Sequence, residues 1–414
     1  MIADRDLVQE RSHRRLVLRG CCVSVQGGES RVRLLAFRLN RPRGWFVKTN
    51  GDGMRIATVV GARPQLIKAA VVSRKIREHH EEILIHTGQH YDTALSAIFF
   101  DELGLPVPDV NLQIGSASHG LQTARMLTGL EREFQDRSPS FVLLYGDTNS
   151  TLAGAIAAAK MNVPIGHVEA GVRHYDRSVP EEVNRVLTDH VSSLSFCPTR
   201  RAVANLAKEG VEDGVHWTGD VMYDSVLAYE DIVSKASDVL SVLDLSPGEY
   251  YLATVHRASN TDVAENLREI LTALGALDRV VVLPLHPRTR KVLDSLSDAT
   301  SLTGSPHLKI IDPQGYLEFL ALEKGAQLIL TDSGGVQKEA YFLRVPCITL
   351  RTYSPWPETV SDGWNTLVPP RRDEILAAVK RMTRPAERGA DAFGDGRAAV
   401  AIRDLLDRWE EAHA

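Results

Sequence analysis

The chain of 414 residues contains few cysteines, no dinucleotide-binding glycine fingerprint and no long apolar run. Four scattered cysteines are too few for a disulfide framework, so we expect free thiols in a reducing compartment. No stretch reaches the roughly 18 uninterrupted apolar residues of a membrane span, and charges interrupt the N-terminal region where a signal peptide would lie. A net charge of -5 argues against a nucleic-acid binder. We therefore expect a cytoplasmic protein with no membrane or nucleic-acid partner.

The absence of GxGxxG after any of the expected strands means that a tightly held NAD is not indicated. His86 and His90 have the i,i+4 spacing of some metal ligands, but Gly88 lies between them and no carboxylate is obvious nearby in the sequence. We expect neither a metal nor a cofactor.

Residues 1–53 differ from the rest of the chain in charge. They contain eleven Lys and Arg against five Asp and Glu, a net of +6 (11 − 5), and show no clear helical or strand period. A disordered or non-native leader and a functional basic arm are the two interpretations, and we favour the leader.

From Met54 onward, short β-branched runs alternate with segments of helical spacing. The first series of apolar runs reads "MRIATVVG", "EEILIHTG", "SFVLLYGD", "VPIGHVEAG" and "SSLSFCPT". The second series reads "YYLATVHR", "RVVVLPLHP", "LKIIDP", "AQLILTDSGG" and "VPCITLR". This alternation predicts parallel sheets with crossover helices.

The length suits two domains, and one series gives way to the other near Thr218-Gly219-Asp220. We predict an α/β protein with two doubly wound, Rossmann-like domains, 54–218 and 219–395, facing a central cleft. Ligands of such sheets bind at the carboxyl ends of the strands, so the motifs that follow strands are the candidate site residues.

Two of these motifs suit a phosphate group. In "LILTDSGGVQKEA" an apolar strand runs into Ser333, Gly334 and Gly335 and then into a helix, whose first N–H groups and dipole favour an anion. In "GARPQLIK" Arg63 and Lys68 lie beside another helix start. Solvated side chains around an ordinary turn are the alternative for this second motif.

Three acidic residues occupy comparable positions. Asp147 and Glu169 each follow an apolar strand, and Glu181 opens a helix with Arg185 four residues later. Asp147 could instead cap a helix, and Glu181–Arg185 could be a surface pair. If the three acids converge, their crowding raises their pKa values, as proton transfer near neutral pH requires. A His-Arg pair, residues 256–257, would face the same cleft.

Taken in order, the motifs "GARPQLIK", "GDTNST", "HVEAGVR", "PEEVNR", "HR", "IDPQGYLEFL", "TDSGGVQKEA" and "RTYSPWPETV" resemble those of the non-hydrolysing UDP-N-acetylglucosamine 2-epimerases. The likeness runs from about Met54 to the C-terminus. It implies the GT-B fold, with a final helix at about 396–414 that crosses back to the first domain. It also implies a homodimer and a UDP-sugar substrate, whose C2 is inverted by elimination of UDP to a 2-acetamidoglucal and re-addition.

The resemblance assigns roles to individual residues. The diphosphate would lie at Ser333, Gly334 and Gly335, with help from Arg63 and His256. Glu339 matches a ribose-binding position, and Phe319 matches one near the uracil. The remaining assignments fall into three groups: catalytic Asp147, Glu169, Glu181 and His256; substrate-binding Lys68, Arg185, Arg257 and Arg351; and allosteric Gln89 and His90.

This chain departs from the family pattern at four places: Ser259-Asn260 where Glu-Asn is usual, Ser354-Pro355 where Thr-Glu is usual, Lys338 where an acid is common, and Ser118-His119 where activated members have Arg-Gln. The expected substrate is UDP-N-acetylglucosamine, and a modified sugar such as UDP-2,3-diacetamido-glucuronate is the alternative. The other classes are a GT-B glycosyltransferase, an inactive UDP-sugar sensor and a hydrolysing epimerase.

Overall fold

The computed structural model describes residues 53–89, 100, 102–236, 238–387, 389 and 392–414, which belong to one compact unit of the chain, Gly44–Ala414. The predicted leader lies outside the described residues, apart from Gly53, and so does His90.

The first sheet is parallel and has the order β3-β2-β1-β4-β5-β6-β7. Its strands are β1 (Arg55–Val60), β2 (Glu81–His86), β3 (Val110–Asn111), β4 (Phe141–Tyr145), β5 (Ile165–Val168), β6 (Leu194–Cys197) and β7 (Val215–Trp217). The helices between them include α1 (Arg63–Ile76), α3 (His119–Arg137), α4 (Asn149–Lys160), α5 (Pro180–Val191) and α6 (Arg200–Lys208). The order reverses between β1 and β4, which makes their carboxyl ends a switch point.

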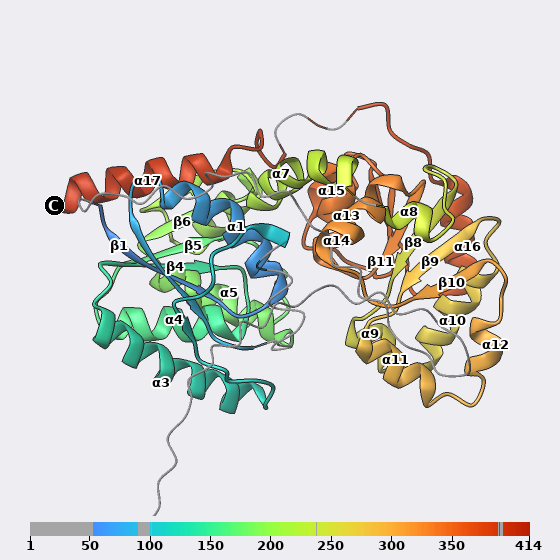
Figure 1. Ribbon diagram of the computed structural model, residues 1–414, viewed down its shortest axis with the longest axis horizontal. Coiled ribbons are helices and arrows are strands. Elements are labelled where there is room, and N and C mark those ends of the chain that lie inside the picture. The colour runs from blue at the N-terminus through green and yellow to red at the C-terminus, as the bar shows by residue number, and fades with distance from the viewer. Residues whose placement is uncertain (1–52, 90–99, 101, 237, 388, 390–391) are drawn as a thin grey trace, which may run out of the picture. The chain divides into compact units, whose positions relative to one another are not determined.

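Both faces of the inner strands of this sheet are buried because these strands are mostly apolar. Ile56 and Val60 of β1 belong to the core that includes α1 and the C-terminal helix α17 (Ala398–His413), whereas Ala57 and Val59 belong to the core under α3 and α4. Figure 1 shows these helix pairs on opposite sides of the sheet. This near-continuous burial is typical of parallel sheets.

The helix α17 returns to the first sheet, as predicted. The rings of Trp409 and Phe141 lie edge to face, with centroids 5.9 Å apart. Arg403 Nη1 donates to Glu78 Oε2 at 2.7 Å, which ties α17 to the segment after α1.

The second sheet is also parallel, in the order β10-β9-β8-β11-β12-β13. Its strands are β8 (Tyr250–Thr254), β9 (Val280–Pro284), β10 (Leu308–Ile311), β11 (Leu328–Thr331), β12 (Cys347–Thr349) and β13 (Asn365–Leu367). One face packs on α13 (Tyr316–Gly325) and α14 (Gly334–Phe342), and the other on α10 (Ala264–Gly275) and α16 (Arg372–Arg381). The remaining short helices are α8 (Val239–Val242), α9 (Ala258–Thr261), α11 (Pro287–Asp294), α12 (Ala299–Thr303) and α15 (Pro357–Ser361).

The helix α7 (Val221–Ala236) joins the two sheets, because it packs against α1 on one side and against α13 and α14 on the other. Its buried Val226 and Tyr229 belong to one core cluster that includes residues of both sheets. The Tyr229 hydroxyl donates to the carbonyl of Leu103 at 2.8 Å. One continuous apolar core therefore runs through this bridge.

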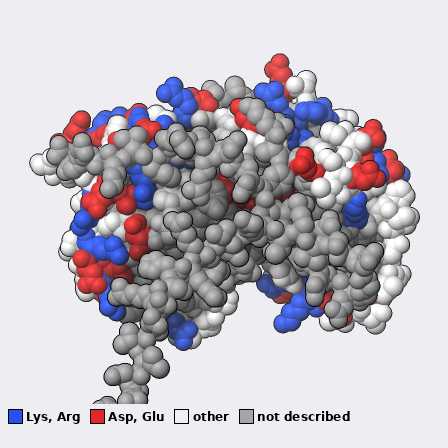
Figure 2. Space-filling model, viewed as in Figure 1, with Lys and Arg blue, Asp and Glu red and all other residues white. Residues whose placement is uncertain are grey.

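Lys and Arg side chains are interspersed with Asp and Glu over the described part of the face drawn in Figure 2. Within the described ranges, no helix combines the length and the apolar character that crossing a bilayer requires.

Candidate functional site

Asp147 and Glu169 lie at the same edge of the first sheet, as predicted. Tyr145 and Val168, the last residues of β4 and β5, are register partners. Glu169 follows Val168 directly, and Asp147 follows Tyr145 after Gly146. Thr148, rather than Asp147, caps α4, because its side chain accepts from the N–H of Thr151. Asp147 is therefore left to pair with Arg185, and their side chains are in contact.

Glu169 adopts a positive φ of 73°, a strained conformation for a residue with a side chain and one that is common at functional sites. Its Oε2 atom lies 2.7 Å from Lys68 Nζ and 2.8 Å from Lys338 Nζ. Burial opposes the charge, but the two ammonium groups hold the pKa of Glu169 far below its ordinary value. The prediction that crowding raises the pKa values of the acids is therefore wrong for Glu169, since cations surround it.

The start of α5 places acids differently from the predicted surface pair. Arg185 donates to Glu182 Oε2 at 3.2 Å as well as contacting Asp147. Burial works against the charge of Arg185, but the neighbouring carboxylates raise its pKa above the ordinary value. Glu181 Oε1 instead lies 3.8 Å from Nη1 of Arg257, which follows β8. This contact brings two predicted site residues from different sheets together.

His256 and Arg257 are held by Asp332, a residue to which the sequence pattern assigns no role. The fully buried Asp332 accepts from the N–H groups of His256 at 3.1 Å and Arg257 at 3.0 Å, and from Asn260 Nδ2 at 3.0 Å. Burial lowers the pKa of His256 in spite of the opposing effect of Asp332, so the imidazole is mainly neutral at pH 7. His256 can therefore donate a hydrogen bond to a diphosphate but supplies little fixed charge.

The predicted anion site at the start of α14 follows β11, the neighbour of β8 in the sheet. Ser333 is the N-cap and accepts from the N–H of Val336, so its hydroxyl oxygen serves the helix itself. Gly334 and Gly335 are the first two helical residues, whose N–H groups have no acceptor within an α-helix. This helix start can hold an anion through its backbone.

Two arginines contribute unsatisfied buried donors. The Nε atoms of Arg257 and Arg351 are buried and have no hydrogen-bond partner among the described residues. The guanidinium of Arg351 lies 3.9 Å from the ring centroid of Tyr353. Burial, helped by Arg257, lowers the pKa of Arg351 to about 10, which leaves it charged at neutral pH. A bound anion would satisfy these donors.

A second group of predicted residues surrounds Arg63. Its Nη1 donates to the carbonyl of Gln314 at 3.4 Å. Burial lowers the pKa of Arg63, and among the carboxylates that oppose this change Glu339 on α14 has the largest effect. Burial raises the pKa of Glu339 in spite of Arg63 and Lys338. Glu323 on α13 is fully buried beside Glu339.

Two other predicted site residues, Phe319 and Gln89, lie outside these two groups. Phe319 lies half-buried on α13 and packs against the core. The side-chain oxygen of Gln89 accepts from the Ser150 hydroxyl at 2.8 Å, at the start of α4, so Gln89 supports that helix.

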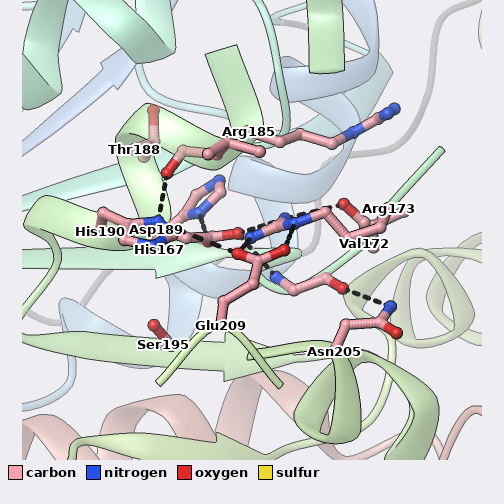
Figure 3. Close-up of polar contacts among 12 residues, drawn as sticks. His167, Val172, Arg173, Arg185, Thr188, Asp189, His190, Ser195, Asn205 and Glu209 are labelled. Atoms are coloured by element: carbon pink, nitrogen blue, oxygen red, sulfur yellow. Dashed lines mark hydrogen bonds and ion pairs between the residues drawn. The ribbon is translucent and has the colours of Figure 1, made fainter. Parts of the chain in front are cut away.

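Figure 3 shows a buried polar network around Asp189, which the sequence pattern does not predict. Asp189 of α5 accepts from His167 Nδ1 at 2.6 Å, from Arg173 Nη1 at 2.6 Å and from the N–H of Gly171 at 3.1 Å. His167 Nε2 lies 2.7 Å from the carbonyl of Gly146. Both ring nitrogens of His167 therefore lie against acceptors, a carboxylate and a backbone carbonyl.

This network fixes the peptides that carry the acids. His167 holds the carbonyl that precedes Asp147, and Asp189 holds the loop that follows Glu169. The signals were present but weak: His167 is a polar residue within an apolar strand, and Asp189 is four residues after Arg185 on the same helix.

The geometry combines a fixed anion site with groups for proton transfer. One sheet edge carries Asp147 and Glu169, the other carries His256 and the start of α14, and Glu181 with Arg257 links them. Preorganised donors and cations can stabilise a leaving anion, and carboxylates can move a proton.

Comparison with known proteins shows the relationship directly. A family model described as UDP-N-acetylglucosamine 2-epimerase matches residues 74–407. A UDP-N-acetylglucosamine 2-epimerase homolog from Methanococcus maripaludis is 52% identical over 354 residues, which cover 85% of this chain and 99% of the relative. The UDP-2,3-diacetamido-2,3-dideoxy-D-glucuronate 2-epimerase of Pseudomonas aeruginosa is 45% identical, with coverage of 85% and 99%.

A solved structure gives the same result. The crystal structure of the Methanocaldococcus jannaschii UDP-GlcNAc 2-epimerase, in complex with UDP-GlcNAc and UDP, matches with a TM-score of 0.80 and 41% identity, covering 86% of this chain and 100% of that one. The predicted fold of two Rossmann-like domains, GT-B, is confirmed. The chain belongs to the UDP-N-acetylglucosamine 2-epimerase family.

Proposed function

We propose that this protein is a non-hydrolysing epimerase that inverts C2 of UDP-N-acetylglucosamine to give UDP-N-acetylmannosamine. The names of its relatives support this activity. The observation that carries it is the contact between groups from the two sheets. Glu181 lies on α5, whose Arg185 contacts Asp147, and its Oε1 atom is 3.8 Å from Nη1 of Arg257, whose backbone N–H donates to Asp332 just before the α14 start.

In this mechanism the C1–O bond breaks, and UDP leaves with the bonding electron pair. The helix start at Gly334 and Gly335, with Arg257 and Arg351, takes up the negative charge of the departing diphosphate. The C2 proton passes to a carboxylate, and the C2–H electrons form the C1=C2 bond of a 2-acetamidoglucal. Re-addition of UDP at C1, with a proton delivered to the opposite face of C2, completes the inversion.

The test is product analysis by NMR with UDP-sugar alone and no acceptor. An epimerase converts UDP-N-acetylglucosamine into a mixture of the two epimers. A glycosyltransferase without acceptor leaves it unchanged, and a hydrolysing enzyme releases free N-acetylmannosamine. Turnover of UDP-2,3-diacetamido-glucuronate with no change in UDP-N-acetylglucosamine would replace the proposed substrate by that of the Pseudomonas aeruginosa relative.

A matched pair of variants tests the site. Asp147→Asn removes the carboxylate that pairs with Arg185, and a loss of about a hundredfold or more in turnover is expected for a proton-transfer group. The same substitution at Asp136, on the exposed face of α3, serves as the control and should leave turnover unchanged. Equal turnover by both variants would contradict the assignment.

The homodimer is also part of this proposal, and so is the cytoplasmic location. Val183, Leu187 and Val191 follow one another at four-residue intervals on α5, and all three are exposed. Such an apolar stripe suits a contact with a second copy of the chain. Light scattering should show a dimer that Leu187→Glu dissociates, whereas Val107→Glu, at an exposed position outside the stripe, should not. A monomeric wild type would contradict this.

A further inference from the structure

Lys338 is an unusual member of the site, because it is charged and almost completely enclosed. Its side chain on α14 is 2% exposed. Its Nζ lies 2.8 Å from Glu169 Oε2, 2.7 Å from Asp220 Oδ2 and 4.0 Å from the ring centroid of Trp356. An enclosed ammonium group of this kind has no surface for a substrate, so it acts through its neighbours.

The neighbour that matters is Glu169, because its Oε2 atom pairs with the Nζ atoms of both Lys338 and Lys68. The two lysines come from α14 and α1, which pack on different sheets. Two ammonium groups within hydrogen-bonding distance of one carboxylate oxygen favour its ionised form strongly. Protonation of Glu169 would deprive Lys68 of this charge and leave Lys338 with Asp220.

A carboxylate that transfers protons cannot be held permanently in its ionised form. A group that both takes and returns a proton near neutral pH works best when its pKa lies near that pH. Lys338 and Lys68 hold the pKa of Glu169 far below its ordinary value, although burial acts in the other direction. A carboxylate held in this way is a weak base and is not available as an acid.

We propose, on the basis of the proposed function, that Lys338 is a positioning residue that withdraws Glu169 from proton transfer. Glu169 then serves as a fixed negative charge that stabilises the positive charge developing on the sugar ring as the C1–O bond breaks. The two transfers at C2, removal from one face and delivery to the other, fall to Asp147 and Glu181. This assignment reduces the three expected acid/base carboxylates to two.

The other charged groups around this cluster are part of the argument. Glu169 faces Lys68 from α1, Lys338 from α14 and Arg185 from α5. Lys338 also faces Asp220, at the start of α7, and Glu339 on its own helix. Lys68, Lys338 and Arg185 are all cations, so they act on Glu169 in the same direction.

The experiment follows the ionisation of Glu169 by NMR of glutamate labelled with ¹³C at the carboxyl carbon, with Glu169→Gln used to assign the signal. In the wild type the signal should stay at the ionised position from pH 8 down to about pH 4.5, near the ordinary pKa of a glutamate. In Lys338→Met it should titrate at a pH higher by about one unit or more, and Lys338→Arg should restore the wild-type behaviour. Lys324→Met is the control, because Lys324 pairs with Glu230 at the surface.

The pH profile of turnover gives a second readout. Lys338→Met should lose turnover at the acidic end of the profile, where its Glu169 becomes protonated, so that its acidic limb lies at higher pH than that of the wild type. A purely structural defect would lower turnover equally at every pH. An unchanged acidic limb in a folded, active Lys338→Met variant would overturn the proposal. So would a Glu169 signal that titrates at or above the ordinary value in the wild type.

The titration also separates this proposal from the proposed function. It is recorded without substrate, so it decides the state of Glu169 even if UDP-N-acetylglucosamine is not turned over. If Lys338→Met fails to fold, the wild-type titration alone decides the matter.

Discussion

Substitution of Asp189 by asparagine should be among the most destabilising single changes in the first sheet. The carboxylate is fully buried on α5, between His167 and Arg173. Burial opposes its charge, but the interactions with His167 and Arg173 hold the pKa of Asp189 below its ordinary value. Asparagine removes the charge and places an amide, itself a donor, among three N–H donors.

The magnitude follows from the partners that remain. Removing one member of a buried ion pair leaves an uncompensated charge and costs about 3–5 kcal/mol. Arg173 keeps Glu209, with contacts of 2.7 and 2.8 Å, and is therefore only partly affected. His167 loses its single carboxylate partner in this network. We expect a loss of about 3 kcal/mol in the free energy of unfolding.

Urea denaturation of the wild type and Asp189→Asn at pH 7 measures this difference. Asp298→Asn is the control, because Asp298 pairs with an arginine on the exposed surface and its loss should be barely detectable. Because the pKa of Asp189 is lowered by folding, its stabilisation is complete above the unfolded pKa of about 3.9. It is lost as the pH falls from there through the folded pKa, so the gap between wild type and variant should narrow below about pH 4. An Asp189→Asn variant as stable as Asp298→Asn at pH 7 would refute the reasoning.

Three further predictions concern the supports of the site. Gly171→Ala should destabilise the protein by about 1 kcal/mol more than Gly210→Ala does, or by a larger amount. Both glycines have positive φ, but only at Gly171 would the new Cβ lie 2.4 Å from a carbonyl oxygen, that of Ala202. Equal urea midpoints for the two variants would contradict this. Burial raises the pKa of Asp224, which binds the N–H groups of Ala398 and Ala399, to about 6, so its contribution is complete below the unfolded pKa of about 3.9 and is lost as the pH rises through 6. The stability of the wild type relative to Asp224→Asn should therefore grow by up to about 2–3 kcal/mol between pH 7 and pH 4, and a constant difference would contradict the assignment. Asp332→Asn should weaken UDP binding in calorimetry by about tenfold or more, because the turn of His256 and Arg257 loses its anionic acceptor; unchanged affinity would show that the turn does not need it.

The sequence predicted the long, apolar strands well because fully buried parallel strands have a strong apolar signal. The short strands β3, β7 and β13, of two or three residues, were not predicted, since they contain too few residues to show a pattern. Each of them lies at the end of its sheet. Pairing with a neighbouring strand, which the sequence does not display, decides their structure.

The sequence pattern likewise indicates some residues of the candidate site but not the partners that hold them. Asp147, Glu169, His256 and the Ser333 turn could be selected as candidates because strand ends in a doubly wound sheet meet at one edge. The partners could not, since Asp332, Asp189 and Lys338 act through contacts between segments that lie far apart in the sequence. Lys338 was visible as a departure from the family pattern, but its contact with Glu169 needed the fold.

The central claim is that carboxylates on one sheet edge exchange the C2 proton of a UDP-sugar whose diphosphate is held on the other. The most direct measurement is NMR of the products formed in deuterated water. The account predicts one deuterium at C2 in each product molecule, and a strong reduction of its incorporation in Asp147→Asn. Epimerised product that retains hydrogen at C2 would contradict it.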